Sequence, residues 1–377
     1  MAENKDKKVL NVPNLRFPEF EGEWEKCKLG DACNVFMCKR ILATQTNTEG
    51  GVPFYKIRTI GGTPDAYISK ELFDDYKTKY NYPHKGEVMI TCAGTVGKCV
   101  IYDGKDAYYQ DSNIVWIDNP SQYIGNGFLY HLLANVDWRK LNSTTIIRIY
   151  NDDLRNLKLS YPQIEEQKKI SRLLSLLDDR ISTQNKIIED LKKLKSVISD
   201  RLFKNIKGDV ITLSEICDIV KGKQINGEYL TESGEYYVMN GGTEPSGYYG
   251  DYNVDANTIS ISEGGNSCGY VQFNTSPFWS GGHCYSIQNI ADHVDNLYLY
   301  HYLKSNEEVI MRLRIGSGLP NIQKKDLTMF KIKVPTFEQQ ITISTFLSSL
   351  ERKADIEERI LNVILKQKLY LLQQMFI

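Results

Sequence analysis

Hydrophobic residues recur every seven positions along two long segments of the chain. In the first segment, one seam position is occupied by Ile170, Leu177, Leu191 and Ile198, and the other by Leu174, Ile181, Ile188 and Leu202. In the second segment, the matching residues are Ile343, Leu350, Ile364 and Leu371, and then Leu347, Ala354, Leu361 and Met375. Spacing of this kind, sustained over about five heptads, predicts coiled-coil helices. At about 1.5 Å per residue, helices of roughly 40 residues span about 60 Å, the length of a spacer rod.

The two seams also carry polar residues at matched places. Gln184 corresponds to Glu357, and Lys195 corresponds to Lys368. Polar seam positions commonly fix the register and the partner of a coiled coil. We therefore expect the two helices to pack on each other. The alternative is that they are two unrelated surface helices, each packed on its own domain.

The helices belong to an internal duplication. Residues 153–203 align without a gap with residues 326–376, and 15 of the 51 positions are identical. Each segment begins with an extended stretch, followed by proline (Pro162 and Pro335) and then Glu-x-Gln, features typical of a helix start. Further upstream, Lys39-Arg40-Ile41 resembles Lys223-Gln224-Ile225, and Leu129-Tyr130-His131 resembles Leu299-Tyr300-His301.

The regions that precede the helices have the pattern of β-rich domains. Predicted strands are Glu87–Thr91, Ile114–Ile117, Thr258–Ser262 and Tyr270–Phe273, with short helices at Leu129–Ala134 and Leu297–Leu303. Paired glycines separate the strands. The fold class is therefore α+β, and the predicted domains are 14–155, a helix segment 156–208, a second domain 209–328, and a second helix segment 329–377.

The glycine clusters at 94–97 and 264–269 raise the question of a phosphate-binding loop. No Gly-Lys-Ser/Thr follows either cluster, and no dinucleotide-binding fingerprint is present. We interpret them as turns between paired strands, a geometry that also lets backbone N–H groups approach a DNA phosphate.

Composition narrows the class of protein. The chain has 377 residues, of which 41% are hydrophobic and 25% charged, as in ordinary globular proteins. No apolar run approaches the length of a membrane span, and residues 1–12 lack the apolar core of a signal peptide. The eight cysteines include no Cys-x-x-Cys, which disfavours a zinc site. We expect a reduced protein of the cytoplasm with no membrane partner.

Candidate catalytic groups are scarce. The repeated His131 and His301 lack a repeated acidic partner, so we interpret them as packing residues. The Asp/Asn-Pro-Pro-Tyr/Phe motif of amino-methyltransferases is absent, and no helicase motif or metal-nuclease cluster is evident. The sequence therefore predicts no enzyme, no metal and no cofactor on this chain.

The paired Asp-Leu…Pro-x-x-Glu-x-Gln-x-x-Ile segments at 153–170 and 326–343 resemble the specificity subunits (HsdS) of type I restriction–modification systems. The opening Leu15-Arg16-Phe17-Pro18-Glu19-Phe20, Ser262-Glu-Gly-Gly and Phe278-Trp-Ser-Gly-Gly-His283 are also similar to this family.

The resemblance implies two target-recognition domains that each read half of an asymmetric, bipartite site in double-stranded DNA. It also implies two helices packed antiparallel as a spacer, in a pseudo-twofold arrangement. The implied partners are two methyltransferase subunits and restriction–translocase subunits, which would carry S-adenosylmethionine, ATP and Mg²⁺.

Polar and basic residues in the glycine-rich turns are the candidates for reading bases. Arginine and lysine suit guanine, and asparagine and glutamine suit adenine. The candidates are Lys39, Arg40, Lys56, Arg58, Thr59, Thr95 and Lys98 in the first domain, and Lys223, Gln224, Asn240, Thr243, Asn266 and His283 in the second.

Charge complicates this prediction. Residues 209–328 carry 7 basic and 15 acidic residues, whereas residues 14–155 carry 17 and 18. Because phosphate contacts supply most non-specific DNA affinity, we expect the isolated chain to bind DNA weakly. The alternative function is a duplicated β-rich module that binds another ligand, such as a glycan.

Overall fold

The computed structural model describes residues 10–111, 113–140, 148–316, 318 and 320–377. They form two compact units, one from the described residues up to 183 together with 361–377, and the other from the described residues of 184–360. Residues 112, 141–147, 317 and 319 of the predicted recognition domains lie outside the described residues. The four-part division of the chain at 155, 208 and 328 remains a prediction.

The first unit is built on three small sheets. Strand β1 (Glu25–Lys28) pairs antiparallel with β9 (Lys158–Tyr161), directly before the first long helix. An antiparallel sheet has the order β2-β8-β5-β6, with bounds Asn34–Phe36, Ile114–Asp118, Val88–Thr91 and Cys99–Ile101. A third sheet has the order β4-β3-β7, with bounds Tyr67–Ile68, Val52–Tyr55 and Tyr108–Tyr109.

The second unit repeats the same three sheets in the same strand order. Strand β10 (Asp209–Thr212) pairs with β18 (Lys331–Val334) before the second long helix. The four-stranded sheet is β11-β17-β14-β15, with bounds Asp218–Lys221, Cys284–Gln288, Thr258–Ser262 and Val271–Asn274. The third is β13-β12-β16, with bounds Tyr248–Tyr249, Tyr236–Met239 and Trp279–Ser280. The predicted duplication and the predicted strands are thus confirmed.

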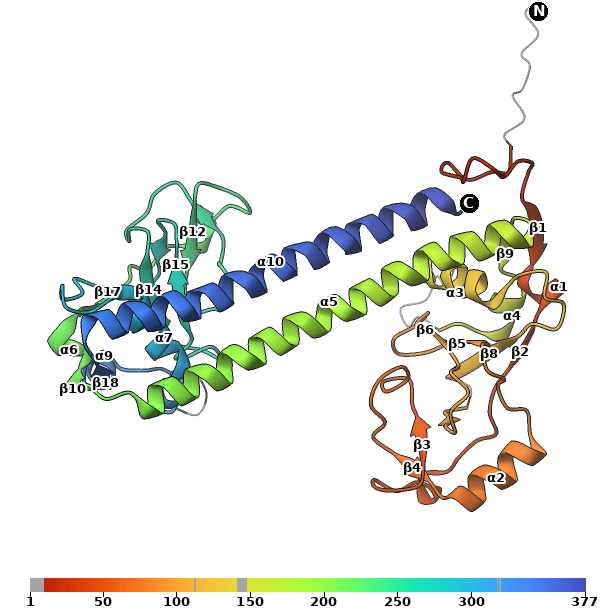
Figure 1. Cartoon of the computed structure of the whole chain (residues 1–377), viewed down its shortest axis with the longest axis horizontal. Helices are drawn as coiled ribbons and strands as arrows, with labels where there is room; N and C mark the ends of the chain where they lie inside the picture. Colours follow the sequence, from red (N-terminus) through yellow and green to blue (C-terminus); the bar gives the residue numbers. More distant parts are fainter. Residues whose placement is uncertain (1–9, 112, 141–147, 317, 319) are drawn as a thin grey trace, which may run out of the picture. The chain divides into compact units, whose positions relative to one another are not determined.

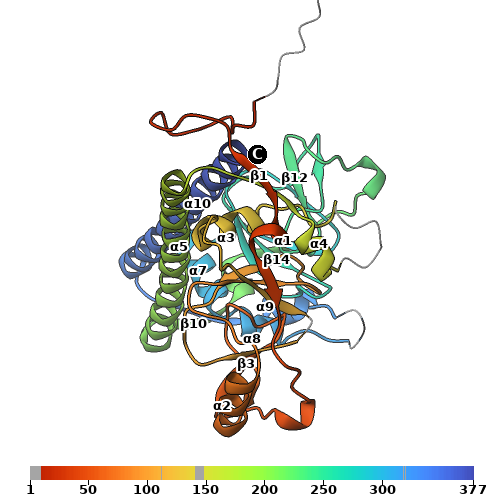
Figure 2. The ribbon, with the colours of Figure 1, turned by 90° about the vertical axis from the view of Figure 1, so that its right-hand side faces the viewer.

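Short helices connect the sheets. In the first unit they are α1 (Leu29–Ala32), η1 (Ala43–Gln45), α2 (Lys70–Lys79), α3 (Asn126–Ala134) and α4 (Asn151–Arg155). In the second unit they are α6 (Leu213–Ile216), η2 (Gly227–Tyr229), α7 (Asn296–Ser305), α8 (Glu307–Met311) and α9 (Lys324–Thr328). In both views α3 lies against the first part of the long helix α5 (Figures 1 and 2).

The long helices are α5 (Ile164–Asn205) and α10 (Phe337–Met375), and they pack together in opposite directions. Contacts in the second unit show the direction, because Gln184 bonds to Glu357 whereas Lys195, further along, pairs with Glu351. Every predicted seam residue is buried or half-buried. The heptads are therefore confirmed, and the interpretation as two unrelated surface helices is wrong.

A buried glutamine explains why Glu-x-Gln recurs at both helix starts. The side-chain NH₂ of Gln167 donates to the carbonyls of Pro162 and Tyr123, and its oxygen accepts from Gly125 N–H at 2.8 Å. Gln340 makes the same three bonds, to Pro335, His293 and Asp295. Each glutamine thus joins the start of a long helix to the segment that leads into α3 or α7.

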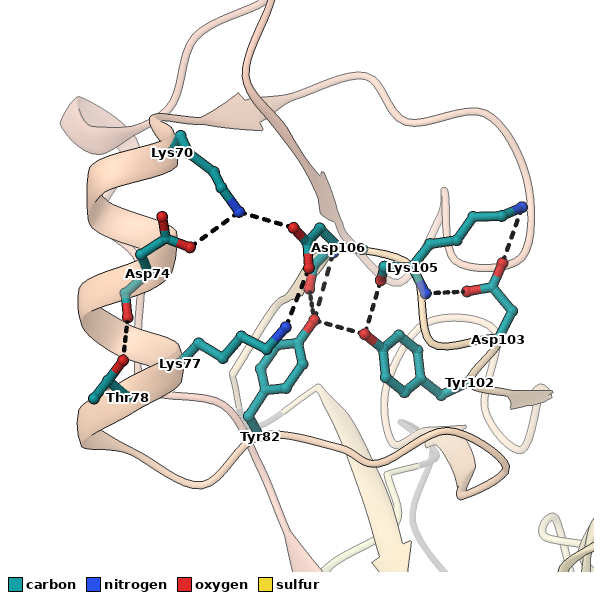
Figure 3. A network of polar contacts seen from close by, with 10 residues as sticks. Lys70, Asp74, Lys77, Thr78, Tyr82, Tyr102, Asp103, Lys105 and Asp106 are labelled. Atoms are coloured by element: carbon teal, nitrogen blue, oxygen red, sulfur yellow. Dashed lines mark hydrogen bonds and ion pairs between the residues drawn. The ribbon is translucent and has the colours of Figure 1, made fainter.

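The units differ most in the region beside the third sheet. In the first unit, a separate core lies between the sheets and includes Phe73 of α2, Tyr108 and Trp116. Outside this core, Lys70 and Lys77 of α2 both bind the carboxylate of Asp106, at 2.8 and 3.1 Å (Figure 3). In the second unit, residues 250–257 occupy the place of α2 without forming a helix, and the matching core is only a small cluster around Phe278.

Candidate nucleic-acid interface

Two loops carrying predicted DNA-binding residues meet in the first unit. Loop 56–62 follows β3, and loop 92–98 joins the paired strands β5 and β6. The Lys98 ammonium donates to the carbonyl oxygen of Ile60 at 2.5 Å. A Cβ at Gly94, which has φ +66°, would lie 2.7 Å from the Ile57 side chain, so the loops touch closely. The structure thus brings Lys56, Arg58, Thr59, Thr95 and Lys98 into one region.

The remaining two candidates of this unit lie on the segment after β2. Arg40 is exposed and its guanidinium lies 3.8 Å from the Asp111 carboxylate. The Lys39 ammonium lies over the Tyr80 ring, 5.3 Å from its centroid. Gln110, the neighbour of Asp111, accepts a hydrogen bond from Ile57 N–H, which connects this segment to loop 56–62. The cationic candidates therefore lie on three segments that follow β2, β3 and β5.

Three glycine-rich loops meet at the matching place in the second unit. They are 240–243, 263–266 and 281–283. The Asn240 side-chain oxygen accepts from His283 N–H at 3.1 Å. A Cβ at Gly241 would lie 3.1 Å from His283 Cβ, and one at Gly282 would lie 2.4 Å from the Gln224 side-chain oxygen.

The other candidates of the second unit lie on the same loops or beside them. Lys223 N–H donates to Ser280 O at 2.9 Å, and the Trp279 indole donates to Lys223 O. Thr243 and Asn266 are exposed on loops 240–243 and 263–266. All six candidates thus lie around one set of loops, and whether they contact DNA remains a prediction.

Glu263, which was not among the predicted residues, is buried in the centre of these loops. Its carboxylate binds the Lys221 ammonium at 2.5 Å and accepts from the Tyr285 hydroxyl at 3.0 Å. Burial and the charge of Glu263 raise the pKa of that hydroxyl. A glutamate directly after a strand is the only signal that the sequence offers, and it does not reveal burial.

The glycine clusters form connections between paired strands, as predicted. Gly97 N–H donates to Thr91 O, and Gly269 N–H donates to Ser262 O, each at 2.8 Å. Gly97 and Gly269 have φ of +82° and +92°, in the region that favours glycine.

The repeated histidines are packing residues, as predicted. His131 and His301 are buried against Ser175 and Ser348, which are matched residues of the two long helices. Burial lowers the pKa of each imidazole to about 4, so both rings are neutral at physiological pH. Their ring nitrogens are used inside the protein.

Among the residues that the structure describes, no group of three or more His, Cys, Asp or Glu side chains is arranged to hold a metal ion. No helix in the described ranges is both long and apolar enough to cross a membrane.

Comparison with known proteins now gives the class. Residues 21–193 and 205–366 each match the type I restriction modification DNA specificity domain. A putative type I restriction enzyme specificity subunit from Haemophilus influenzae is 49% identical over 184 residues, which are 49% of this chain and 45% of that protein. The matched part therefore spans less than half of that relative.

Two further proteins match almost throughout. The putative MjaX specificity subunit of Methanocaldococcus jannaschii is 23% identical, over 93% of this chain and 92% of its own. The crystal structure of a type I restriction–modification S subunit from Mycoplasma genitalium has the same fold, with a TM-score of 0.72 at 20% identity, over 97% of this chain and 99% of that one.

The chain belongs to the family of type I restriction–modification DNA specificity subunits, and it carries the family's domain twice. Membership places it among the non-catalytic subunits of such systems. It also decides between the two functions left open by the sequence, in favour of DNA specificity over glycan binding.

Proposed function

We propose that each unit reads one half of a bipartite, asymmetric site in double-stranded DNA. The observation that carries the proposal is the repeated framework with different loop side chains. Matched loops end on the same sheet, but Lys56 in one unit is Asn240 in the other, as the equivalent strand pairings show. Two different sets of donors and acceptors on one framework suit two different half-sites.

The side chains suggest different preferences. The first unit offers Arg40, Arg58 and Lys98, cations that suit the O6 and N7 atoms of guanine. The second offers Gln224 and Asn240, amides that suit adenine. We infer that the first half-site is richer in G·C pairs at the contacted positions.

The chemistry belongs to partner subunits in this proposal. Two methyltransferase subunits with S-adenosylmethionine, and restriction–translocase subunits with ATP and Mg²⁺, would assemble on the chain. A solved chain of the same fold, with a TM-score of 0.54 at 17% identity, comes from work on complex assembly of a type I system. Acting on cellular DNA, the complex would work in the cytoplasm.

The charge of the second domain suggests that this chain and its partner subunits share the contacts to DNA phosphates. Residues 209–328 have a net charge of −8, because they hold 7 basic and 15 acidic residues. Such a region would bind a polyanion poorly by itself. The partner subunits would therefore supply a large part of the phosphate contacts.

Reconstitution with the methyltransferase subunits tests the proposal. The complex should methylate a two-part motif when S-adenosylmethionine is added, and the pure chain should methylate nothing. In the complex, Arg58→Ala should relax only the first half-site and Asn240→Ala only the second. Methylation by the chain alone, or a motif without two separable halves, would contradict the proposal.

A further inference from the structure

One oxygen of the Glu263 carboxylate lacks a hydrogen bond in the part of the chain that the structure describes. Its Oε1 is bound by the Lys221 ammonium and by the Tyr285 hydroxyl. Its Oε2 is buried without a partner, and the side chain is only 11% exposed. Because buried polar groups are nearly always paired, this oxygen requires an explanation.

The His283 imidazole is the group placed to donate a hydrogen bond to this oxygen. Its Nδ1 lies 3.6 Å from Glu263 Oε2, somewhat beyond hydrogen-bond distance. A carboxylate oxygen can only accept, so any bond between them requires a proton on Nδ1. The hydrogen bond that one ring nitrogen makes then decides what the other can do.

The backbone of His283 is fixed while its ring remains accessible. Its N–H donates to the Asn240 side chain at 3.1 Å, and its C=O accepts from Glu263 N–H at 2.8 Å. The ring passes close to Gly264, where a Cβ would lie 3.8 Å from Nδ1. The side chain is nevertheless 63% exposed. The Nδ1 edge of the ring thus lies toward Glu263, while most of the side chain is exposed.

We propose that Glu263 is a positioning residue that holds His283 as a hydrogen-bond donor to DNA. The inference rests on the proposed function and deepens it. In the complex, the ring would lie between the Glu263 carboxylate and the DNA. Both offer acceptors, so a ring that bonds to both carries a proton on each nitrogen. Nδ1–H then donates to Oε2, and Nε2–H donates to an acceptor of the DNA.

Two acceptors share this chemistry. One is a guanine edge, through O6 or N7, and the other is a phosphate oxygen. A donor is valuable here because the surrounding region carries a net charge of −8 from its 7 basic and 15 acidic residues.

The first unit has no such pair at the equivalent positions. The matched strand pairings place Cys92 where the second unit has Glu263, and Asn113 where it has His283. The partners of the carboxylate also differ, because Met37 and Val115 correspond to Lys221 and Tyr285. The pair of Glu263 and His283 therefore concerns the second half-site alone, and the first half-site serves as an internal control.

The test uses the full chain in complex with its methyltransferase subunits and measures both DNA affinity and the methylated motif. His283→Ala should weaken binding about tenfold, since a hydrogen bond to a charged donor is lost. Glu263→Gln, which keeps the shape of the side chain, should weaken binding less. In the His283→Ala background, Glu263→Gln should have no further effect on affinity, because its role acts through the histidine.

The motif separates the two acceptors. A guanine contact predicts relaxed preference at one position of the second half-site. A phosphate contact predicts an unchanged motif, lower affinity for every sequence, and a salt dependence reduced by about one ion. Either result supports the donor role of His283.

Glu307→Gln is the matched control for loss of a partly buried carboxylate in the same unit. Glu307 binds Lys304 and Val271 N–H, away from the glycine-rich loops. It should alter thermal stability without altering the motif. The inference is overturned if His283→Ala leaves affinity and motif unchanged, or if Glu263→Gln acts equally in both backgrounds. A wild-type complex without a bipartite motif would instead overturn the proposed function.

Discussion

The two units share their framework but differ in the loops that the framework presents. Matched framework residues make matched bonds: His131 and His301 with the long helices, and Gln167 and Gln340 at the helix starts. At the loops the correspondence fails, as the Glu263–His283 pair shows.

The duplicated chain has kept its side chains in the framework and changed them in the loops. The shared bonds tie α3 and α7, and the segments that lead into them, to the long helices. The differing side chains lie on loops beyond the strand ends, so their replacement leaves the sheets intact. One framework can thus present two recognition surfaces.

The largest change in the methylated motif should come from altering the long helices. One heptad added to both α5 and α10 keeps the apolar seam facing its partner and adds about 10 Å at about 1.5 Å per residue. We expect the half-site sequences to persist while the gap between them grows by roughly three base pairs, at about 3.4 Å each. The readout is the methylated motif in cells.

A two-residue addition is the control for this prediction. It would turn the seam away from its partner, because each residue rotates the helix by about 100°. We expect loss of methylation. A heptad variant that is folded and active but keeps the original gap would show that the helices do not set the distance.

Equivalent glycines should be equally intolerant in the two units. A Cβ at Gly97 would lie 2.2 Å from the Trp138 ring, and one at Gly269 would lie 2.9 Å from Met311. Over-packing and positive φ together should cost roughly 2–4 kcal/mol in the free energy of unfolding for either alanine variant. Urea denaturation measures it.

Gly265→Ala separates the cost of over-packing from the cost of positive φ. Its φ is +78°, but a Cβ there would meet nothing within 4 Å. The expected loss is about 1 kcal/mol, from backbone conformation alone. Equal losses at Gly97, Gly269 and Gly265 would mean that the close approaches are unimportant.

The buried histidines should make both units sensitive to acid to the same degree. Their pKa of about 4 lies below the usual value of 6.5. Between these two pH values, the unfolded chain therefore binds protons that the folded chain does not bind. This contribution to stability is present above pH 6.5 and is lost as pH falls toward 4. When the pH falls from 7.5 to 5, each histidine should lower the free energy of unfolding by about 2 kcal/mol.

Stability measured against pH in variants tests this. The difference in unfolding free energy between wild type and His131→Gln should shrink by about 2 kcal/mol over that range. His301→Gln should behave alike. A difference that stays constant between pH 7.5 and pH 5 would contradict neutral burial.

Substitutions of the polar seam residues should have the smallest effects on the free energy of unfolding. Lys195 pairs with Glu351 at 2.7 Å, and the equivalent Lys368 pairs with Asp178. Because these lysines are mostly buried, Lys195→Met and Lys368→Met should each lower the unfolding free energy by about 1–2 kcal/mol. The exposed pair of Lys192 with Glu358 is the control, and its loss should cost about 0.5 kcal/mol or less. Similar losses for all three lysines would argue against a role of burial.

The framework was predictable because its signals are local or repeated. Seven-residue spacing predicted α5 and α10, and short runs of strand-forming residues between turn glycines predicted β5, β8, β14 and β15. The pairing of Lys195 with Glu351 was not predictable, since seam periodicity identifies a face of a helix but not which side chains meet across it. The helix α2 was likewise missed, because its core residue Phe73 stands among charged neighbours.

The candidate interface was predictable only as a set of loops. Glycine clusters marked the loops, and their polar residues gave the candidates. The position of Glu263 beneath His283 depends on strand pairing between residues 258–262 and 284–288, which brings distant parts of the chain together. No local pattern encodes that contact.

Exchanging one recognition region shows whether each unit reads its own half-site. Residues 209–328 of this chain would be replaced by the equivalent block of a relative with a different motif, and the methylome of cells carrying the hybrid would be read. We predict that one half-site changes to that of the relative while the other stays as it was. A methylome in which both half-sites change together would contradict it.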